Sequence, residues 1–255
     1  MKKIWILAFR DFRAYFTSPI AYIVIALFLF IMGWFFINNM FFFMQMAQSG
    51  SPYQRGPTPS ITDGIIRPLY SNMNLVLLFL TPFITMRLMA EERKMHTLEL
   101  LMTSPLSVTQ IVLGKFLSAF LLLLCMVLPT MTYPVILSVA GNPDWGPVFT
   151  SIVGTLLMAS CYLSMGLLFS TMTENQIIAG VLTIATSLFF WLVNWASHSA
   201  GPGLAGLLDY LSLIKHLNNF LRGVLDTSDV VYYLSFIFTG LFLTYRAIDS
   251  YRWRS

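Results

Sequence analysis

The chain has 255 residues, of which 57% are hydrophobic and only 10% are charged. A soluble domain usually carries about 25% charged residues, so this sequence cannot supply the polar surface that a soluble fold of its size needs. The net charge is only +4, and no basic run is interleaved with aromatic residues in a polar context, which argues against nucleic acid as a partner. Composition therefore predicts an all-α integral membrane protein in a single domain over residues 1–255.

Apolar stretches of about 20 residues are long enough to cross a bilayer as helices, and the chain contains six of them. The expected spans are residues 20–43, 69–89, 116–139, 148–169, 177–196 and 230–245. The sixth is the shortest, which indicates either a thin membrane or a helix that extends beyond the apolar stretch.

Residues 1–19 differ from the spans because charged and aromatic side chains alternate there. Aromatic side chains recur every three or four residues, which is typical of an amphipathic helix lying in the membrane interface; they are Trp5, Phe9, Phe12 and Phe16. Arg10 and Asp11 interrupt any apolar stretch, so a cleavable signal peptide is not expected. The alternative for this segment is a frayed basic tail.

Orientation follows from the basic residues between the spans. With a cytoplasmic N-terminus, four of the 15 Lys and Arg fall in outer segments and the other 11 lie inside; the outer four are Arg55, Arg67, Lys215 and Arg222. The positive-inside rule therefore predicts that both termini are cytoplasmic.

Two outer segments are long. Residues 45–68 are rich in Gly and Pro and predict a turn-rich loop. Residues 197–229 are too apolar for a simple loop and predict short helices, for which a re-entrant pair is one form.

The densest charge lies between the second and third spans, in a cytoplasmic segment at residues 90–115. Its pattern predicts a short charged-then-apolar helix, a break at Pro105 and another helix that enters the membrane, with a second polar turn that runs to Gly114 and Lys115. A short helix held between two spans is suited to dock on a soluble partner and to pass that partner's motion to both spans.

Here the sequence resembles the ABC-2-type transporter permeases, and among them the gliding-motility-associated permease subunit. The matching stretches are EERK at 91–94, TLELL at 97–101, SPL at 104–106, IVLGK at 111–115, SPI at 18–20, NQI at 175–177 and RGV at 222–224, with Asp226. Their order covers essentially the whole chain.

The resemblance implies a type V exporter-like domain of six transmembrane helices with an N-terminal interfacial helix. It also implies a bacterial cytoplasmic membrane location, a second permease subunit and a separate cytoplasmic ABC ATPase. The residues expected to couple to that ATPase are Glu91, Glu92, Arg93, Lys94, Thr97, Leu98, Glu99, Leu100 and Leu101. One departure is His96, where the family usually has Gly; a specific contact or a solvated side chain are the two alternatives.

Motifs for chemistry are missing from the sequence. It has no phosphate-binding loop of the G-x-x-x-x-G-K-[S/T] type and no H-E-x-x-H zinc motif, so we expect no catalytic, cofactor or metal site. The leading hypothesis is a permease that exports an amphipathic or polymeric substrate through the lipid bilayer. The alternative is a membrane subunit that relays ATPase motion to an extracytoplasmic accessory protein without transport.

Three smaller features of the spans concern packing. Pro129 and Pro134 bend the third span, either as a flexible point or as a packing kink. Ser160 and Ser164 have the spacing of a close helix contact. Cys125 and Cys161 lie in apolar runs and are expected to be buried as small hydrophobic residues.

Overall fold

A computed structural model of the protein describes residues 2–49, 60–97, 106–199 and 202–252, and all regular elements in these ranges are helical. In chain order they are α1 (Lys2–Thr17), α2 (Pro19–Ser49), η1 (Thr62–Ile66), α3 (Arg67–Thr85), α4 (Ala90–Lys94), α6 (Val108–Val127), η2 (Leu128–Met131), α7 (Thr132–Ala140), α8 (Trp145–Met172), α9 (Gln176–Ser199), α10 (Pro202–Leu211), α11 (Leu213–Leu221) and α12 (Thr227–Arg252).

The six predicted spans are confirmed, and the helical stretches are longer than hydropathy indicated. They are Ala21–Met46, Thr62–Lys94, Val108–Val139, Trp145–Met172, Gln176–Ala196 and Thr227–Ser250. The sixth stretch is therefore long enough to cross a bilayer of ordinary thickness, because about 20 residues suffice.

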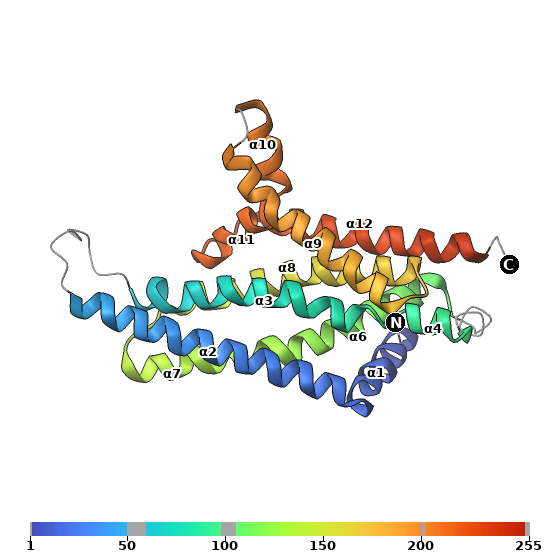
Figure 1. The fold of residues 1–255 in the computed structure, drawn as a ribbon, viewed down its shortest axis with the longest axis horizontal. Coiled ribbons are helices and arrows are strands. Elements are labelled where there is room, and N and C mark those ends of the chain that lie inside the picture. Colours follow the sequence, from blue (N-terminus) through green and yellow to red (C-terminus); the bar gives the residue numbers. More distant parts are fainter. Residues whose placement is uncertain (1, 50–59, 98–105, 200–201, 253–255) are drawn as a thin grey trace.

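The long helices lie roughly side by side along the long axis of the molecule, as Figure 1 shows. Helices α1 and α4 and the C-terminal end of α12 gather at one end, whereas α7 lies at the opposite end (Figure 1). We call the first of these the basic end, and define it by α1, residues 86–97, the α8–α9 turn and the end of α12. Helix α10 projects away from the bundle (Figure 1).

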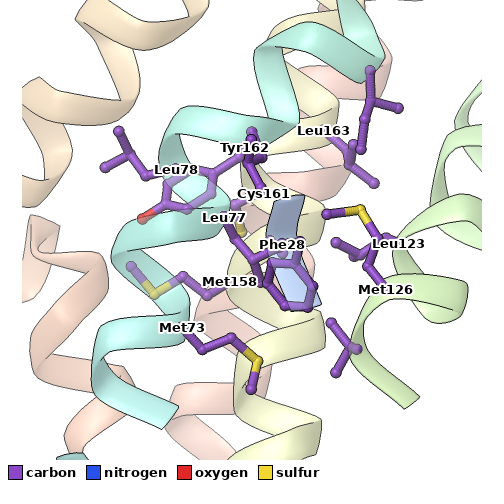
Figure 2. Close-up of a cluster of buried hydrophobic side chains, with 14 of the residues drawn as sticks. Phe28, Met73, Leu77, Leu78, Leu123, Met126, Met158, Cys161, Tyr162 and Leu163 are labelled. Carbon is purple, nitrogen blue, oxygen red and sulfur yellow. The ribbon is translucent and has the colours of Figure 1, made fainter. Parts of the chain in front are cut away.

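The core lies where α2, α3, α6 and α8 meet. Figure 2 shows side chains from these four helices in contact, among them Phe28, Met73, Leu123, Met126 and Tyr162. All five are fully buried. Cys161 is buried in the same cluster and Cys125 is half-buried, and both are free thiols, so the expectation of burial holds fully only for Cys161.

Small residues bring α8 close to its neighbours. A Cβ at Gly240 of α12 would lie 2.7 Å from the Ser164 Oγ of α8, so the predicted close contact at Ser164 exists. A Cβ at Gly166 would lie 2.5 Å from the Thr85 Cβ of α3. At these points the backbone of α8 lies directly against the Thr85 side chain of α3, and the backbone of α12 lies against Ser164 of α8.

The helix predicted to enter the membrane after Pro105 is α6, but the third span was placed too late, at residue 116. Ser107 caps α6, because it accepts from the Gln110 amide while the Gln110 side chain accepts from the Ser107 amide. Gly114 and Lys115 consequently lie inside α6. The outer loop is also narrower than residues 45–68, since α2 continues to Ser49 and η1 begins at Thr62. Of the two prolines predicted to bend the third span, Pro129 lies in the short 3-10 helix η2 that interrupts the span between α6 and α7, whereas Pro134 lies inside α7.

The N-terminal segment is a helix, as predicted, and Ser18 separates it from α2. Its aromatic side chains form a row of ring contacts from Trp5 to Tyr22, and Trp5 and Phe9 are exposed. A different face, with Leu7 and Ala8, is buried, and Leu7 packs against Gly114 of α6. The helix thus docks on the bundle through Leu7 and Ala8, with Phe12, Tyr15 and Phe16 partly buried against the core, and its placement in the interface stays a prediction.

Helices α10 and α11 account for the short helices predicted in residues 197–229. Asp229, at the start of α12, contacts both the His216 Nδ1 at 2.6 Å and the Asn219 Nδ2 at 2.8 Å. The second ring nitrogen of His216 lies 3.1 Å from the Tyr210 carbonyl. This cluster fastens α10 and α11 to α12.

Candidate functional site: an elbow at the basic end

The segment predicted to couple to a partner follows α3 directly in the chain. We call this bent connection the elbow (residues 86–97). It continues from α3 through hydrogen bonds from the Met86 amide to the Pro82 carbonyl and from the Leu88 amide to the Thr85 carbonyl. Helix α4 follows at once. The residues between α3 and α4 are held by these hydrogen bonds and form no slack loop. A displacement of the elbow therefore acts directly on the end of α3.

A serine of α8 holds the start of the elbow. The Ser170 hydroxyl accepts from the backbone amides of Met89 and Ala90, both at 3.0 Å, and donates to the Met86 carbonyl at 3.2 Å. Two of the donors that a helix leaves unsatisfied at its N-terminus are thereby paired. The side chain of one residue in α8 thus sets the direction in which α4 starts.

An arginine of α4 holds the elbow to the turn between α8 and α9. Arg93 donates to the Thr171 carbonyl at 2.6 Å and pairs with the Glu174 carboxylate at 3.3 Å. The Arg93 side chain is almost buried, whereas Glu174 is exposed. The bond to the carbonyl is charge-assisted and therefore stronger than the exposed ion pair.

A buried lysine of α6 joins the elbow to α1. The Lys115 ammonium pairs with the Glu92 carboxylate of α4 and lies 3.1 Å from Asp11 Oδ2 of α1. The exposed fractions of the three side chains are 6% for Lys115, 20% for Glu92 and 13% for Asp11. A charge with so little access to water is stable only beside opposite charges, so Lys115 holds three helices together.

Next to these contacts, Tyr15 ties α1 to α3. Its hydroxyl donates to the Ile84 carbonyl at 3.3 Å. Burial raises the pKa of the Tyr15 phenol well above its ordinary value, and the negative charge of Asp11 raises it further. The phenol therefore keeps its proton and remains a donor at any physiological pH.

The turn after α4 contains a strained residue. His96 has a φ of 55° and is the one non-glycine residue with positive φ in the described ranges. Left-handed backbone costs a residue with a Cβ roughly 1–2 kcal/mol, and glycine avoids that cost. The turn is therefore of the kind that favours the glycine expected here from the resemblance, although this chain has His.

We expect His96→Gly to raise the free energy of unfolding by about 1 kcal/mol, because it removes the left-handed strain at an exposed position. His96→Val should lower it, since a β-branched residue tolerates this conformation poorly. Thermal unfolding of the detergent-solubilised chain measures both. Equal melting temperatures for the Gly and Val variants would contradict a left-handed backbone conformation at residue 96.

The predicted coupling residues separate into two groups. Glu92 and Arg93 face the bundle and bind Lys115 and the α8–α9 turn, whereas Glu91, Lys94 and Thr97 are exposed. The remaining four, Leu98, Glu99, Leu100 and Leu101, lie outside the described residues. Sequence reasoning did not find the partners of the inward group, which are Lys115, Thr171 and Glu174. It also missed Asp11, which shares Lys115, and Ser170, which holds the backbone at the start of the elbow. The one signal that pointed to them was a charged residue next to a long apolar run, Lys115.

Comparison with known proteins agrees with this architecture. A family model described as "ABC-2 family transporter protein" matches residues 44–213, which is two thirds of the chain and includes the elbow. A search of curated proteins finds no match. The membrane domain of this family is the permease and the ATPase is a separate component, for which the family implies an ABC partner. The chain therefore belongs to the ABC-2 transporter family and is the membrane-spanning permease component of such a transporter.

Proposed function

We propose that two copies of this chain, or this chain and a related permease subunit, export an amphipathic or polymeric substrate across a bacterial cytoplasmic membrane. ATP hydrolysis in a separate cytoplasmic subunit supplies the energy, and the elbow is the place where that subunit docks. One observation carries the proposal. The elbow is bonded to α6 through Glu92 and Lys115, and to the α8–α9 turn through Arg93, and Lys115 extends the first of these links to Asp11 of α1. A push on the elbow therefore reaches several helices together.

The basic end faces the cytoplasm in this proposal. Helices α1 and α4 and the end of α12 bring a set of cations to that end, namely Arg10, Arg13, Arg93, Lys94 and Arg246. The positive-inside rule places such an end in the cytoplasm, where the ATPase is found. Both termini of the chain then lie on the same side as the partner.

Docking and transmission fall to different side chains of the elbow. Lys94 and Met95 are exposed and available to a partner, whereas Arg93 is directed into the bundle. Charge reversal at the exposed residues should therefore weaken binding of the ATPase. Loss of Arg93 should leave binding intact and uncouple hydrolysis from movement of the spans.

Co-purification tests docking. In membranes that contain the cognate ATPase, Lys94→Glu combined with Met95→Asp should reduce the co-purified ATPase at least about tenfold, the loss expected when a charged contact at an interface is reversed. Arg246→Glu, an exposed charge reversal at the same end, is the matched control and should retain it. Arg93→Gln should retain the ATPase but lose substrate-stimulated hydrolysis. Undiminished binding by the double variant would refute docking at the elbow.

The fifth span, α9, is proposed to form the seam with the second permease subunit. Large apolar side chains along it are exposed, among them Val181, Phe189 and Trp195. In a background without native cysteines, Phe189→Cys should cross-link to a second copy with a short bismaleimide. Phe30→Cys on α2, which is equally exposed, should not. Cross-linking at Phe30 alone would move the seam to α2.

The gliding-motility-associated permeases, which the elbow motifs resemble most, leave a second function open. In it, the chain relays ATPase motion to an extracytoplasmic accessory protein and transports nothing. One observation favours this candidate: the His216–Asp229 cluster fastens α10 and α11 to α12, so movement of α12 would carry the outer helices with it. Substrate-stimulated ATPase activity in liposomes that lack any accessory protein would support export and contradict this second function.

A further inference from the structure

A cavity of about 410 Å³ lies beside the elbow, between α1, α2, α3 and α6. Its volume is in the range of small-ligand sites. One part of its lining is apolar and includes Val24, Phe83 and Ile84, and the other part is ionic and includes Arg87 and Glu91. Because α2 begins at Pro19 and α3 ends at Thr85, the cavity lies where these two helices end, at the basic end of the bundle.

Most of the charges around the cavity are already paired. Asp11, Lys115 and Glu92 form the buried bridge described above. Within the described part of the chain, Arg87 is different: its Nε is buried without a hydrogen-bond partner, and its guanidinium forms no ion pair. The Glu91 carboxylate, at the exposed rim, likewise has no partner in that part of the chain. The cavity thus presents one unmatched cation and one unmatched anion.

An unmatched Arg favours an anionic oxygen ligand such as a phosphate, because the guanidinium offers several donors in a fixed plane. An unmatched carboxylate favours an N–H donor with a positive charge. A ligand that satisfies both is a zwitterion with a phosphate and a primary ammonium a few bonds apart. A quaternary ammonium satisfies the charge of Glu91 but donates no hydrogen bond.

The apolar wall indicates a lipid in place of a free solute. Phe83 is 49% exposed and Phe79, one helical turn away on α3, is 44% exposed. Both face outward from a membrane-spanning helix, where acyl chains would cover them. A headgroup in the cavity would therefore be continuous with chains that lie along this face of α3, as in other headgroup sites formed between spans.

We propose that this cavity binds a phospholipid with a primary amine, such as phosphatidylethanolamine, with its phosphate on Arg87 and its ammonium on Glu91. Bound there, the headgroup contacts α1, α3 and the elbow together. It would bias the angle between the interfacial helix and the bundle, next to the charges that hold the elbow in place.

Native mass spectrometry of the purified full chain tests the site. The protein is exchanged into micelles that contain equal amounts of phosphatidylethanolamine, phosphatidylcholine and phosphatidylglycerol, and retained lipids are counted. We expect phosphatidylethanolamine to be retained about tenfold over phosphatidylcholine, which corresponds to one charge-assisted hydrogen bond. Equal retention of the two would overturn the proposal.

Variants separate the two halves of the site. Arg87→Gln should abolish preferential retention, and Glu91→Gln, at an exposed position, should remove only the preference for the primary amine. Arg13→Gln, an exposed charge on α1 outside the cavity, is the control and should change neither. Unchanged lipid retention in the Glu91 variant would overturn the assignment even if the Arg87 variant failed to fold. Displacement of the lipid by water-soluble phosphoethanolamine at equal concentration would show a solute site and contradict the role of Phe83.

Discussion

Replacing Lys115 with methionine will lower the free energy of unfolding by about 3 kcal/mol. Methionine is nearly as long as lysine, so the effect reports the charge and not a cavity. Without the ammonium, the carboxylates of Asp11 and Glu92 face each other with little access to water. This loss of stability should lie at the lower end of the range for breaking a buried salt bridge, because Arg10 still pairs with Asp11 at 2.8 Å.

Two controls distinguish the effect of breaking this buried salt bridge from the effect of removing any lysine. Lys215→Met breaks the exposed pair with Asp209 and should cost less than about 1 kcal/mol. Adding Asp11→Asn and Glu92→Gln to Lys115→Met should restore most of the stability, since the stranded charges are then gone. Stability is measured by thermal unfolding in one detergent. Equal effects of the two lysine substitutions would mean that Lys115 is solvated.

Replacing Gly166 with alanine will destabilise the bundle by about 3 kcal/mol, the upper range for overpacking a tight core. The added methyl group would lie 2.5 Å from the Thr85 Cβ and closer still to its hydroxyl. The Thr85 Cβ is fixed to the α3 backbone, so it cannot move away from the added methyl group without a shift of a helix. Thr85 also immediately precedes the elbow, so the same substitution should reduce coupled ATPase activity.

Gly146→Ala is the matched control because a Cβ there meets nothing within 4 Å. It lies in the first turn of α8 and should be neutral or slightly stabilising. Combining Gly166→Ala with Thr85→Gly moves the methyl group to the other helix and should recover part of the loss. If the Gly166 and Gly146 variants unfold at the same temperature, α3 and α8 are not in close contact.

Hydropathy was sufficient to predict six spans, their order and their approximate positions, because each core is a run of about 20 apolar residues. The helix ends were not predictable in this way. The third span begins at Val108 and not at Phe116, since Lys115 marks a boundary only if its charge is in water. Its counter-charges come from Asp11 and Glu92, which are distant in sequence. The sequence around Lys115 therefore indicated an unusual charge but not which residues pair with it.

The elbow was predicted in position but only partly in detail. Its charges and the following Pro105 indicated a short charged-then-apolar helix between two spans. Helix α4 covers part of the charged half, at Ala90–Lys94, and the apolar half lies outside the described residues. Which of its charges face inward depends on the direction set by Ser170 and on the carbonyl of Thr171. Neither residue is distinctive in sequence. The glycine-like turn at His96 was indicated only by the resemblance to a family.

The most direct test of the central claim is a photo-cross-linking amino acid placed at Met95 of the elbow and, for comparison, at Val224 in the turn between α11 and α12. Both positions are exposed. In membranes containing the assembled transporter, we expect the ATPase to cross-link from Met95 and not from Val224. Cross-links from Val224, or none from Met95 in a complex that still co-purifies, would contradict the claim that the ATPase acts on the elbow.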